Sequence, residues 1–343
     1  MADVEGQRLR LLQRMRVDCG PFFLEQLADP QVIEIMLNAD GRLWLDKAGV
    51  GMIDSGHKMS EAAARSLLET TAGMLDTTVK KDRPILGGEF PLDNSRLMAI
   101  LPPITEAPVF ALRKKANFVF PLEEYASKGM LRPGTNKRAV RGEFDFLAGN
   151  TPLEALRNAV RSRANILVVG GTGSGKTTLA NAVNDAIAKE CPDDRIVVIE
   201  DTRELQMRVP NHLMLRSNDD TSMQDLLKAT MRLRPDRIIV GEVRGGEAHT
   251  LLKAWNSGHP GGVATIHADS ASEGLAKLAT YCCENPNAQT STEERMSQTV
   301  ASVVQVVLFI ERLGESPGRA VSEICRVRGF KNGSFDLESV TFN

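Results

Sequence analysis

The sequence predicts two domains: a smaller α+β domain, followed by a larger α/β domain with a mainly parallel sheet. Three observations indicate this organisation. The chain has 343 residues, which is more than one average domain. Over the first 126 residues, expected strands follow one another with few helices between them, which favours an antiparallel sheet. From residue 151 onward, expected strands and helices alternate, which is typical of βαβ units.

The composition is that of an ordinary globular protein with a sizeable core. Hydrophobic residues make up 42% of the chain, charged residues 25%, and the formal net charge is −2. This charge does not indicate a general affinity for nucleic acid or anionic membranes. The five cysteines form no CxxC pair, which predicts reduced thiols in a cytoplasmic protein. The N-terminus lacks the apolar core of a signal peptide, and no apolar run could span a membrane. Any membrane association is therefore expected to be peripheral or through a partner.

The first domain, residues 1–126, is expected to contain a hairpin, a helix and two further strands. The turn pair Asp40-Gly41 is typical of a hairpin, and Ser60 is the expected N-cap of a helix over 60–75. Strands are expected at 32–38, 42–47, 96–104 and 108–115. Residues 127–150 are predicted to be a linker, because 127–144 is rich in glycine, proline and basic residues. A solvated linker face explains these basic residues better than contact with nucleic acid or phospholipid.

The second domain, residues 151–343, is expected to alternate helices and strands before a closing hairpin. A Thr221…Gln224 capping box is expected to begin one helix, and Gly258 to end another. Helices are expected at 151–163, 176–190, 221–233 and 246–257. Strands are expected at 165–171, 195–201, 236–242, 262–268, 321–330 and 335–342.

A phosphate-binding loop lies between the first strand and the second helix of this domain. Residues 170–177, GGTGSGKT, satisfy the pattern G-x-x-x-x-G-K-[ST]. Glycines let the backbone approach a phosphate closely, and the N-terminus of the following helix favours an anion. Lys176 would contact the β- and γ-phosphates, and the Thr177 hydroxyl would face Mg²⁺. We therefore predict that ATP and Mg²⁺ bind here, at Gly170, Gly171, Thr172, Gly173, Ser174, Gly175, Lys176, Thr177 and Thr178.

Acidic residues follow two other expected strands. Glu200 and Asp201 end one strand, and Glu242 ends another. Ligands of open α/β sheets gather at the carboxyl ends of the strands, so these carboxylates are predicted to surround Mg²⁺ and the attacking water. His267 also follows a strand and is expected to sense the γ-phosphate or to complete the site. For His259, a place in the site and a structural hydrogen-bonding role are equally expected.

In this order and spacing, the motifs resemble those of the secretion ATPases of type II and type IV systems. The matching stretches are GGTGSGKTT, VVIEDTREL, RPDRIIVGEVRGGEA and SGHPGGVATIHA, and NSRLMAILPPIT…VFALRK extends the resemblance into the first domain. The resemblance implies a RecA-like P-loop NTPase core with ATP between the two domains. It also implies a homohexameric ring at the cytoplasmic face of the inner membrane. Arg96 and Arg113 match family arginines that reach over the nucleotide, where a guanidinium can stabilise charge on the γ-phosphate.

Within this family, the chain is most similar to the conjugal transfer ATPases of the Trb type. It lacks the extra N-terminal region and the four-cysteine zinc insert that type II secretion and pilus-extension members usually have. It departs from the family pattern in one respect: before Glu242, the strand has only Asp236, at its start. Glu242 is therefore expected to be the main functional carboxylate of this strand, as water activator or in support of Mg²⁺.

The resemblance implies a Mg-dependent ATPase that powers a conjugative or type IV secretion apparatus. Inner-membrane components of a secretion or mating channel are the implied partners, and no sequence-specific binding of nucleic acid is expected. One alternative is an ATPase of pilus biogenesis or retraction. An alternative of another class is a RecA-like nucleic-acid translocase, against which the net charge of −2 weighs. A non-hydrolysing nucleotide-gated scaffold is a third alternative, which the intact acidic and histidine motifs disfavour.

Overall fold

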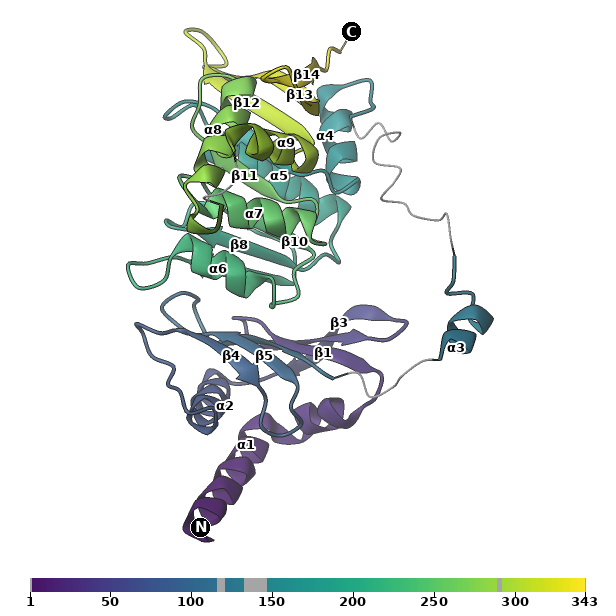
Figure 1. Ribbon diagram of the computed structural model, residues 1–343, viewed down its shortest axis with the longest axis vertical. Coiled ribbons are helices and arrows are strands. Elements are labelled where there is room, and N and C mark those ends of the chain that lie inside the picture. The colour runs from purple at the N-terminus through teal and green to yellow at the C-terminus, as the bar shows by residue number, and fades with distance from the viewer. Residues whose placement is uncertain (1, 116–120, 133–146, 289–291, 343) are drawn as a thin grey trace.

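The computed structural model describes residues 2–115, 121–132, 147–288 and 292–342 (Figure 1). An antiparallel α+β domain precedes a larger domain with a mostly parallel sheet, which confirms the predicted fold class. In Figure 1 the smaller domain runs from purple to blue, and the larger one from teal to yellow.

Among the described residues of the smaller domain, six strands form one sheet in the order β3-β2-β1-β6-β5-β4. Helices α1 (Ala2–Ala28) and α2 (Glu61–Met74) cover one face of it. As predicted, Ser60 caps α2, accepting a hydrogen bond from the backbone N–H of Ala63 at 3.2 Å. The strands are β1 (Val32–Leu37), β2 (Arg42–Lys47), β3 (Gly51–Lys58), β4 (Ile85–Glu89), β5 (Arg96–Ile100) and β6 (Val109–Arg113).

The structure corrects the sequence prediction in this domain at several places. The expected strand at 96–104 ends at Ile100, just before Pro102 and Pro103, which have no backbone N–H for a ladder. Helix α1 and strands β3 and β4 were not predicted. The chain kinks within α1 at Gly20, whose φ of 72° lies in the left-handed region and which precedes Pro21.

A short helix, α3 (Leu122–Ser127), lies between the domains in sequence and apart from both in Figure 1. Most of the predicted linker, 133–146, falls outside the described residues. Leu147 is buried in the core of the larger domain, so its packing begins before the predicted start at residue 151.

In the larger domain, the described strands form an eight-stranded sheet in the order β14-β13-β12-β7-β11-β10-β8-β9. Strands β12, β7, β11, β10, β8 and β9 pair in parallel, and β12, β13 and β14 pair antiparallel, which confirms the closing hairpin. The strands are β7 (Ile166–Val169), β8 (Ile196–Glu200), β9 (His212–Arg216), β10 (Arg237–Val240), β11 (Val263–Ile266), β12 (Val306–Arg312), β13 (Arg319–Lys331) and β14 (Ser334–Ser339).

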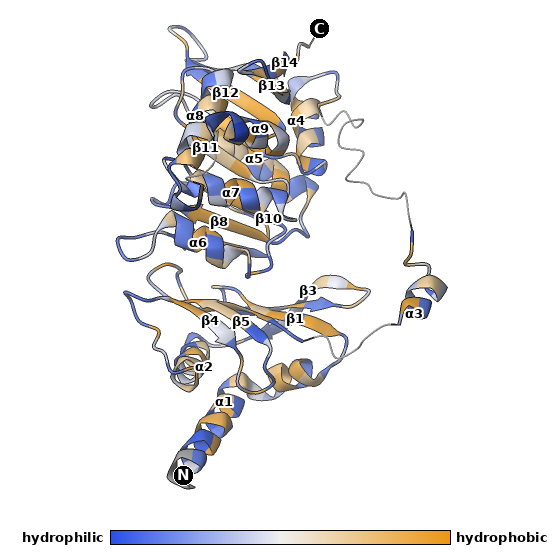
Figure 2. Ribbon diagram, in the orientation of Figure 1, coloured by the Kyte–Doolittle hydropathy of each residue, from blue (hydrophilic) through white to orange (hydrophobic). Residues whose placement is uncertain are grey.

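Helices cover both faces of this sheet. Helices α4 (Pro152–Arg161) and α5 (Lys176–Glu190) pack on one face. The other face holds α6 (Met223–Thr230), α7 (Glu247–Asn256), α8 (Ala271–Cys283) and α9 (Glu293–Val303), with a 3₁₀ turn at Pro286–Ala288. Figure 2 shows the apolar strands between helices whose outer faces are polar. No helix among the described residues is both long and apolar enough to cross a membrane.

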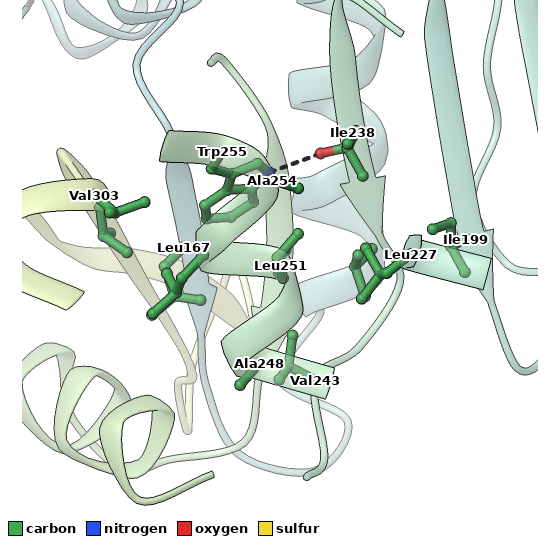
Figure 3. Close-up of a cluster of buried hydrophobic side chains, with 14 of the residues drawn as sticks. Leu167, Ile199, Leu227, Ile238, Val243, Ala248, Leu251, Ala254, Trp255 and Val303 are labelled. Atoms are coloured by element: carbon green, nitrogen blue, oxygen red, sulfur yellow. Dashed lines mark hydrogen bonds between the residues drawn. The ribbon is translucent and has the colours of Figure 1, made fainter. Parts of the chain in front are cut away.

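Trp255 is the largest side chain in the core beneath α7 (Figure 3). Its indole N–H donates a hydrogen bond to the backbone carbonyl of Ile238 at 3.0 Å, which ties α7 to β10. A Cβ atom at Gly262 would overlap the indole ring, so the chain needs glycine there. The predicted end of α7 is confirmed, with Gly258 at a φ of 112°. The predicted capping box of α6 is wrong by one residue: the cap is Ser222, whose hydroxyl accepts from the N–H of Asp225, because the helix begins at Met223.

The two domains pack directly against each other. A single cluster of buried residues includes Met36 and Met98, from the sheet face opposite α1 and α2, and Leu213 and Leu226 of the larger domain. Buried polar side chains join the domains as well, since the Nδ2 atom of Asn38 donates to the Oδ1 atom of Asn211 at 2.9 Å. The interface between the domains of one chain is therefore built like a core, with specific polar contacts.

Candidate active site

The glycine-rich loop follows β7 and turns directly into α5. Gly173 and Gly175 have φ values of 67° and 104°, a conformation that favours glycine. A Cβ atom at Gly170 would overlap the backbone oxygen of Ile310 and the hydroxyl of Ser174. The glycines that the sequence motif requires are therefore also required by the backbone.

A cavity of about 410 Å³ lies beside this loop, at the carboxyl end of the parallel strands. It gathers side chains from α5, the ends of β8, β10 and β11, and β13. Most of the predicted site residues line it, whereas Gly170, Gly171 and Ser174 belong to the loop but not to the lining. The lining residues are Thr172, Gly173, Gly175, Lys176, Thr177, Thr178, Glu200, Asp201, Thr202, Glu204, Leu205, Gly241, Glu242, Arg244, Thr265, His267 and Arg319.

Lys176 begins α5, and its ammonium group lies at the centre of the site. Its Nζ atom donates to the backbone oxygen of Gly171 at 2.9 Å and lies 3.2 Å from the Nδ1 atom of His267. Burial lowers the pKa of Lys176, and the carboxylates of Glu242 and Glu204 oppose that shift. A phosphate group in the cavity would give this partly buried cation a strong counter-charge.

Glu242 follows β10 and lies between a histidine and an arginine. Its Oε1 atom is 2.8 Å from the Nε2 atom of His267, and its Oε2 atom accepts from the Nε atom of Arg244 at 2.7 Å. The close approach to His267 lacks hydrogen-bond alignment, so Oε1 is buried without a hydrogen bond among the described residues. Burial, and then the charge of Lys176, lower the pKa of His267. A buried acceptor without a donor is suited to accept a hydrogen bond from a water molecule or from a bound ligand.

Glu200, at the end of β8, is only 3% exposed and organises the loop that follows it. Its Oε1 atom accepts hydrogen bonds from the backbone N–H groups of Glu204 and Leu205, at 3.0 and 2.8 Å. Burial raises the pKa of Glu200 in spite of these two donors. Asp201 also lines the cavity and forms an ion pair with Arg244.

The hydroxyl and carboxylate oxygens in this cavity are of the kind that bind Mg²⁺. The Thr177 hydroxyl donates to the Oε2 atom of Glu204 at 2.8 Å, and the carboxylates of Glu200 and Glu242 line the same space. Mg²⁺ is commonly held by one or two oxygen ligands together with substrate phosphates and water. Among the described residues, no group of His, Cys, Asp and Glu could enclose a metal without such a substrate.

A family model for type II/IV secretion system proteins matches residues 139–316, which is more than half of the chain. The chain belongs to this family. It is 41% identical to the probable conjugal transfer protein TrbB of Sinorhizobium fredii, over 96% of this chain and 94% of that protein. It is 30% identical to the type IV secretion system protein VirB11 of Brucella suis, over 87% of this chain and 86% of that protein.

A solved structure of a protein from the same family has a similar fold. The crystal structure of the VirB11 ATPase from the Brucella suis type IV secretion system, in complex with sulphate, matches with a TM-score of 0.80 and 27% sequence identity. It covers 92% of this chain and 96% of the solved chain. The protein is therefore a conjugal transfer or type IV secretion ATPase, and the predicted fold, family and branch are confirmed.

The N-terminal arginines of this secretion ATPase lie away from the cavity. Arg96 and Arg113 are exposed and face each other across β5 and β6, and neither lines the cavity. The opposite ends of these strands meet the larger domain, where the carbonyl of Ile104 accepts from the N–H of Arg216 at 2.8 Å. Every described lining residue of the cavity comes from the larger domain, so the structure does not place the cavity between the two domains of one chain.

Two further residues of the predicted motifs lie outside the site. The Nδ1 atom of His259 donates to the carbonyl of Pro235, 2.7 Å away, and His259 does not line the cavity, which agrees with the structural one of its two expected roles. Asp236 lies at the start of β10, at the opposite end from Glu242, and accepts from the N–H of Arg195 at 2.8 Å.

Several residues of the secretion ATPase that contact the site were not among the predicted site residues. Glu204 and Arg244 stand within the recognised acidic motifs, and their charge next to Asp201 and Glu242 was a usable signal. Arg312 and Arg319 come from the distant β12–β13 hairpin. The Nε atom of Arg312 donates to the carbonyl of Gly173 at 3.0 Å, whereas a Cβ atom at Gly175 would lie 3.2 Å from the Cδ atom of Arg319.

Proposed function

We propose that this secretion ATPase hydrolyses MgATP as a subunit of a homohexameric ring and so powers a conjugative or type IV secretion apparatus. The main support is the contact of His267 with both Lys176 and Glu242 beside the glycine-rich loop. It combines a phosphate-binding cation with a carboxylate whose Oε1 atom accepts no hydrogen bond among the described residues. The likeness to TrbB and VirB11 proteins supports the biological role.

The charged and hydroxyl side chains of the cavity have separate roles in this proposal. Lys176 binds the β- and γ-phosphates, and the N–H groups of the loop and of α5 hold the other phosphate oxygens. Thr177, together with the carboxylates of Glu204, Glu200 and Asp201, would hold Mg²⁺. When bound, this ion neutralises the charge that develops on the phosphates. Glu242 orients the attacking water and accepts its proton, and His267 holds the Glu242 carboxylate on the side of the γ-phosphate.

Arg96 and Arg113 are proposed to complete the site of a neighbouring copy in the ring. They are exposed, lie side by side, and do not line the cavity of their own chain. A guanidinium supplied in trans can stabilise the charge of the transferring phosphoryl group. On this proposal, ATP closes the gap between the larger domain of one chain and the smaller domain of its neighbour, and hydrolysis opens it.

The ring is proposed to work in the cytoplasm, held peripherally at the inner membrane by components of the secretion or mating channel.

The test is phosphate release by the purified full-length chain, measured across a range of protein concentrations with and without Mg²⁺. The proposal expects turnover that requires Mg²⁺ and rises in specific activity as rings form, with ring size measured in parallel by light scattering. Turnover that is independent of concentration in a monomer would contradict completion of the site in trans. An assembled ring without turnover would contradict the proposed activity.

A further inference from the structure

An arginine ties the smaller domain to the strand that ends at Glu242. The Nε and Nη2 atoms of Arg234 contact the Oδ2 atom of Asp46, on β2, at 3.0 and 2.9 Å. Its Nη1 atom donates to the Oδ1 atom of Asp236 at 3.2 Å. One guanidinium therefore bridges the two domains and reaches the start of β10.

The backbone of Arg234 is held in an uncommon conformation. Its φ is 62°, in the left-handed region that residues other than glycine rarely adopt. Such a conformation persists only where the surroundings enforce it. The guanidinium between Asp46 and Asp236 contributes to that constraint, so the contact between the domains helps to hold the chain where it enters β10.

The contact reaches both strands that end in site carboxylates. The Oδ2 atom of Asp236 accepts from the backbone N–H of Arg195, and the N–H of Asp236 donates back to the carbonyl of Arg195. These bonds fix the starts of β8 and β10 next to each other. The same two strands end at Glu200 and just before Glu242, and they pair in parallel register along their length.

The surroundings of the bridge are desolvated and charged. Arg195 is fully buried and donates to the side chains of Asn38 and Asn211, from both domains. Glu34 is 3% exposed and stands opposite Asp46 on one side and Arg113 on the other in the sheet register. Because directly opposite residues share a face, this charged row runs from the exposed Arg113 to the bridge at Asp46.

From this geometry we propose that Arg234 is a positioning residue for ATP hydrolysis, which acts through Asp46 and β10 on Glu242. The inference rests on the proposed role of Glu242 and adds the route by which the smaller domain influences it. A short, fully buried strand such as β10 transmits a displacement of its start to its end, since its side chains are close-packed. Movement of the smaller domain would then change the position of the catalytic carboxylate without touching the nucleotide.

The experiment compares Asp46→Asn, Arg234→Gly and the double variant in the full-length chain. Glycine removes the guanidinium and also relieves the left-handed backbone, so Arg234→Gly is expected to fold. Small displacements of a catalytic group cost up to about 10²-fold in rate, so we expect each single variant to lower kcat by roughly tenfold to 10²-fold. KM for ATP and Kd for ADP should change by less than about twofold, since the glycine-rich loop is unaltered. The double variant should be no slower than the slower single variant, because both changes break one contact.

The matched control is Asp54→Asn, which breaks an ion pair with Arg42 (3.3 Å) inside the same sheet and should leave kcat unchanged. The inference is overturned if folded Arg234→Gly keeps the parental kcat, if KM and kcat change together, or if the losses of the two single variants add in the double variant. An inactive parental protein, or one in which Glu242→Gln is fully active, would instead contradict the proposed function itself.

Discussion

The imidazole of His267 stands between Glu242 and the P-loop lysine, with its Nε2 atom 2.8 Å from the Oε1 atom of Glu242. Its other nitrogen, Nδ1, is 3.2 Å from the Nζ atom of Lys176. A protonated imidazole would repel this ammonium group, and accordingly burial and Lys176 lower the pKa of His267. We therefore expect the histidine to be neutral at pH 7 and to hold Glu242 by contact rather than by charge.

Removal of this imidazole should slow the chemical step more than it weakens binding. For His267→Ala we expect kcat to fall by about 10²-fold, as for the loss of one preorganised polar group, with ATP still bound. His267→Gln, which keeps a polar group at the same position, should lose less. Steady-state rates together with ADP titration by calorimetry test this, and an equal rise in KM and fall in kcat for both variants would speak against it.

Lys176→Ala should abolish turnover without unfolding the protein. The ammonium group lines the cavity and, within the part of the chain that the structure describes, forms hydrogen bonds only with Gly171 and His267, so the apolar core is unaffected. Without it the β- and γ-phosphates lose their positive partner. We expect phosphate release at background level with an unchanged thermal midpoint. A folded Lys176→Ala protein with parental turnover would show that the cavity is not where ATP is hydrolysed.

Mixed rings test whether Arg113 acts on a neighbouring copy. Arg113→Ala alone should lower kcat by up to roughly 10³-fold, the low end of what arginine fingers contribute. When inactive Arg113→Ala chains are mixed with inactive Lys176→Ala chains, activity should partly return, because an intact Arg113 then faces an intact glycine-rich loop at some interfaces.

Lys115→Ala is the control for general positive charge in that experiment, since Lys115 is exposed and pairs only weakly, with Glu89 at 3.5 Å. Arg113→Lys should rescue poorly, because an ammonium group cannot reproduce the planar fork of a guanidinium. Mixed rings that stay inactive would assign the arginine to the nucleotide of its own chain. If Arg113→Ala and Lys115→Ala lower kcat by the same small amount, Arg113 contributes only as one charge of a basic surface.

Glu34 should make the stability of the protein depend on pH. Burial raises the pKa of Glu34 to about 7, from 4.5, and Arg234, Arg113 and Arg195 only partly oppose this. The folded state therefore binds the proton more tightly than the unfolded state does. The contribution of Glu34 to the free energy of unfolding is greatest below pH 4.5 and is lost as the pH rises through about 7.

Glu34→Gln replaces this carboxyl group with a neutral amide and should remove that part of the pH dependence. At pH 8 we expect a higher thermal midpoint for Glu34→Gln than for the parent, and a smaller difference at pH 5. Thermal unfolding monitored by circular dichroism across this range provides the measurement. A midpoint for Glu34→Gln that is lower than the parental one at pH 8 would show that the Glu34 carboxylate is a net stabilising partner of the surrounding arginines.

The sequence predicted the site best where function constrains residue type and spacing together. Glu200, Glu242 and His267 lie at or just after the ends of separate strands, and the parallel register brings them into one cavity. Lys176 reaches the same cavity from the start of α5, after the glycine-rich loop that follows β7. That outcome follows from a general rule for α/β sheets. The pattern of apolar residues was also sufficient to predict the hairpin of β1 and β2 and most helices of the larger domain.

The parts that sequence reasoning missed depend on contacts between distant segments. Helix α1 has no clear apolar stripe of its own and is held by burial of Met15 and Phe23 against the sheet. Arg312 and Arg319 reach the glycine-rich loop only because β12 pairs with β7. The packing of Met36 and Trp44 in one cluster with the core of the larger domain likewise has no local signature, and it determines where Arg96 and Arg113 lie.

The central claim is that Glu242 activates water in the cavity beside the glycine-rich loop, and single-turnover phosphate release by Glu242→Gln tests it most directly. Glutamine keeps the shape of the side chain but cannot accept the proton of the water, so the γ-phosphate should remain uncleaved. Binding of ATP, measured by calorimetry on the same protein, should stay close to the parental value. The account predicts an ATP-loaded protein whose cleavage is slowed by at least about 10²-fold. Cleavage at the parental rate, or loss of ATP binding along with cleavage, would contradict it.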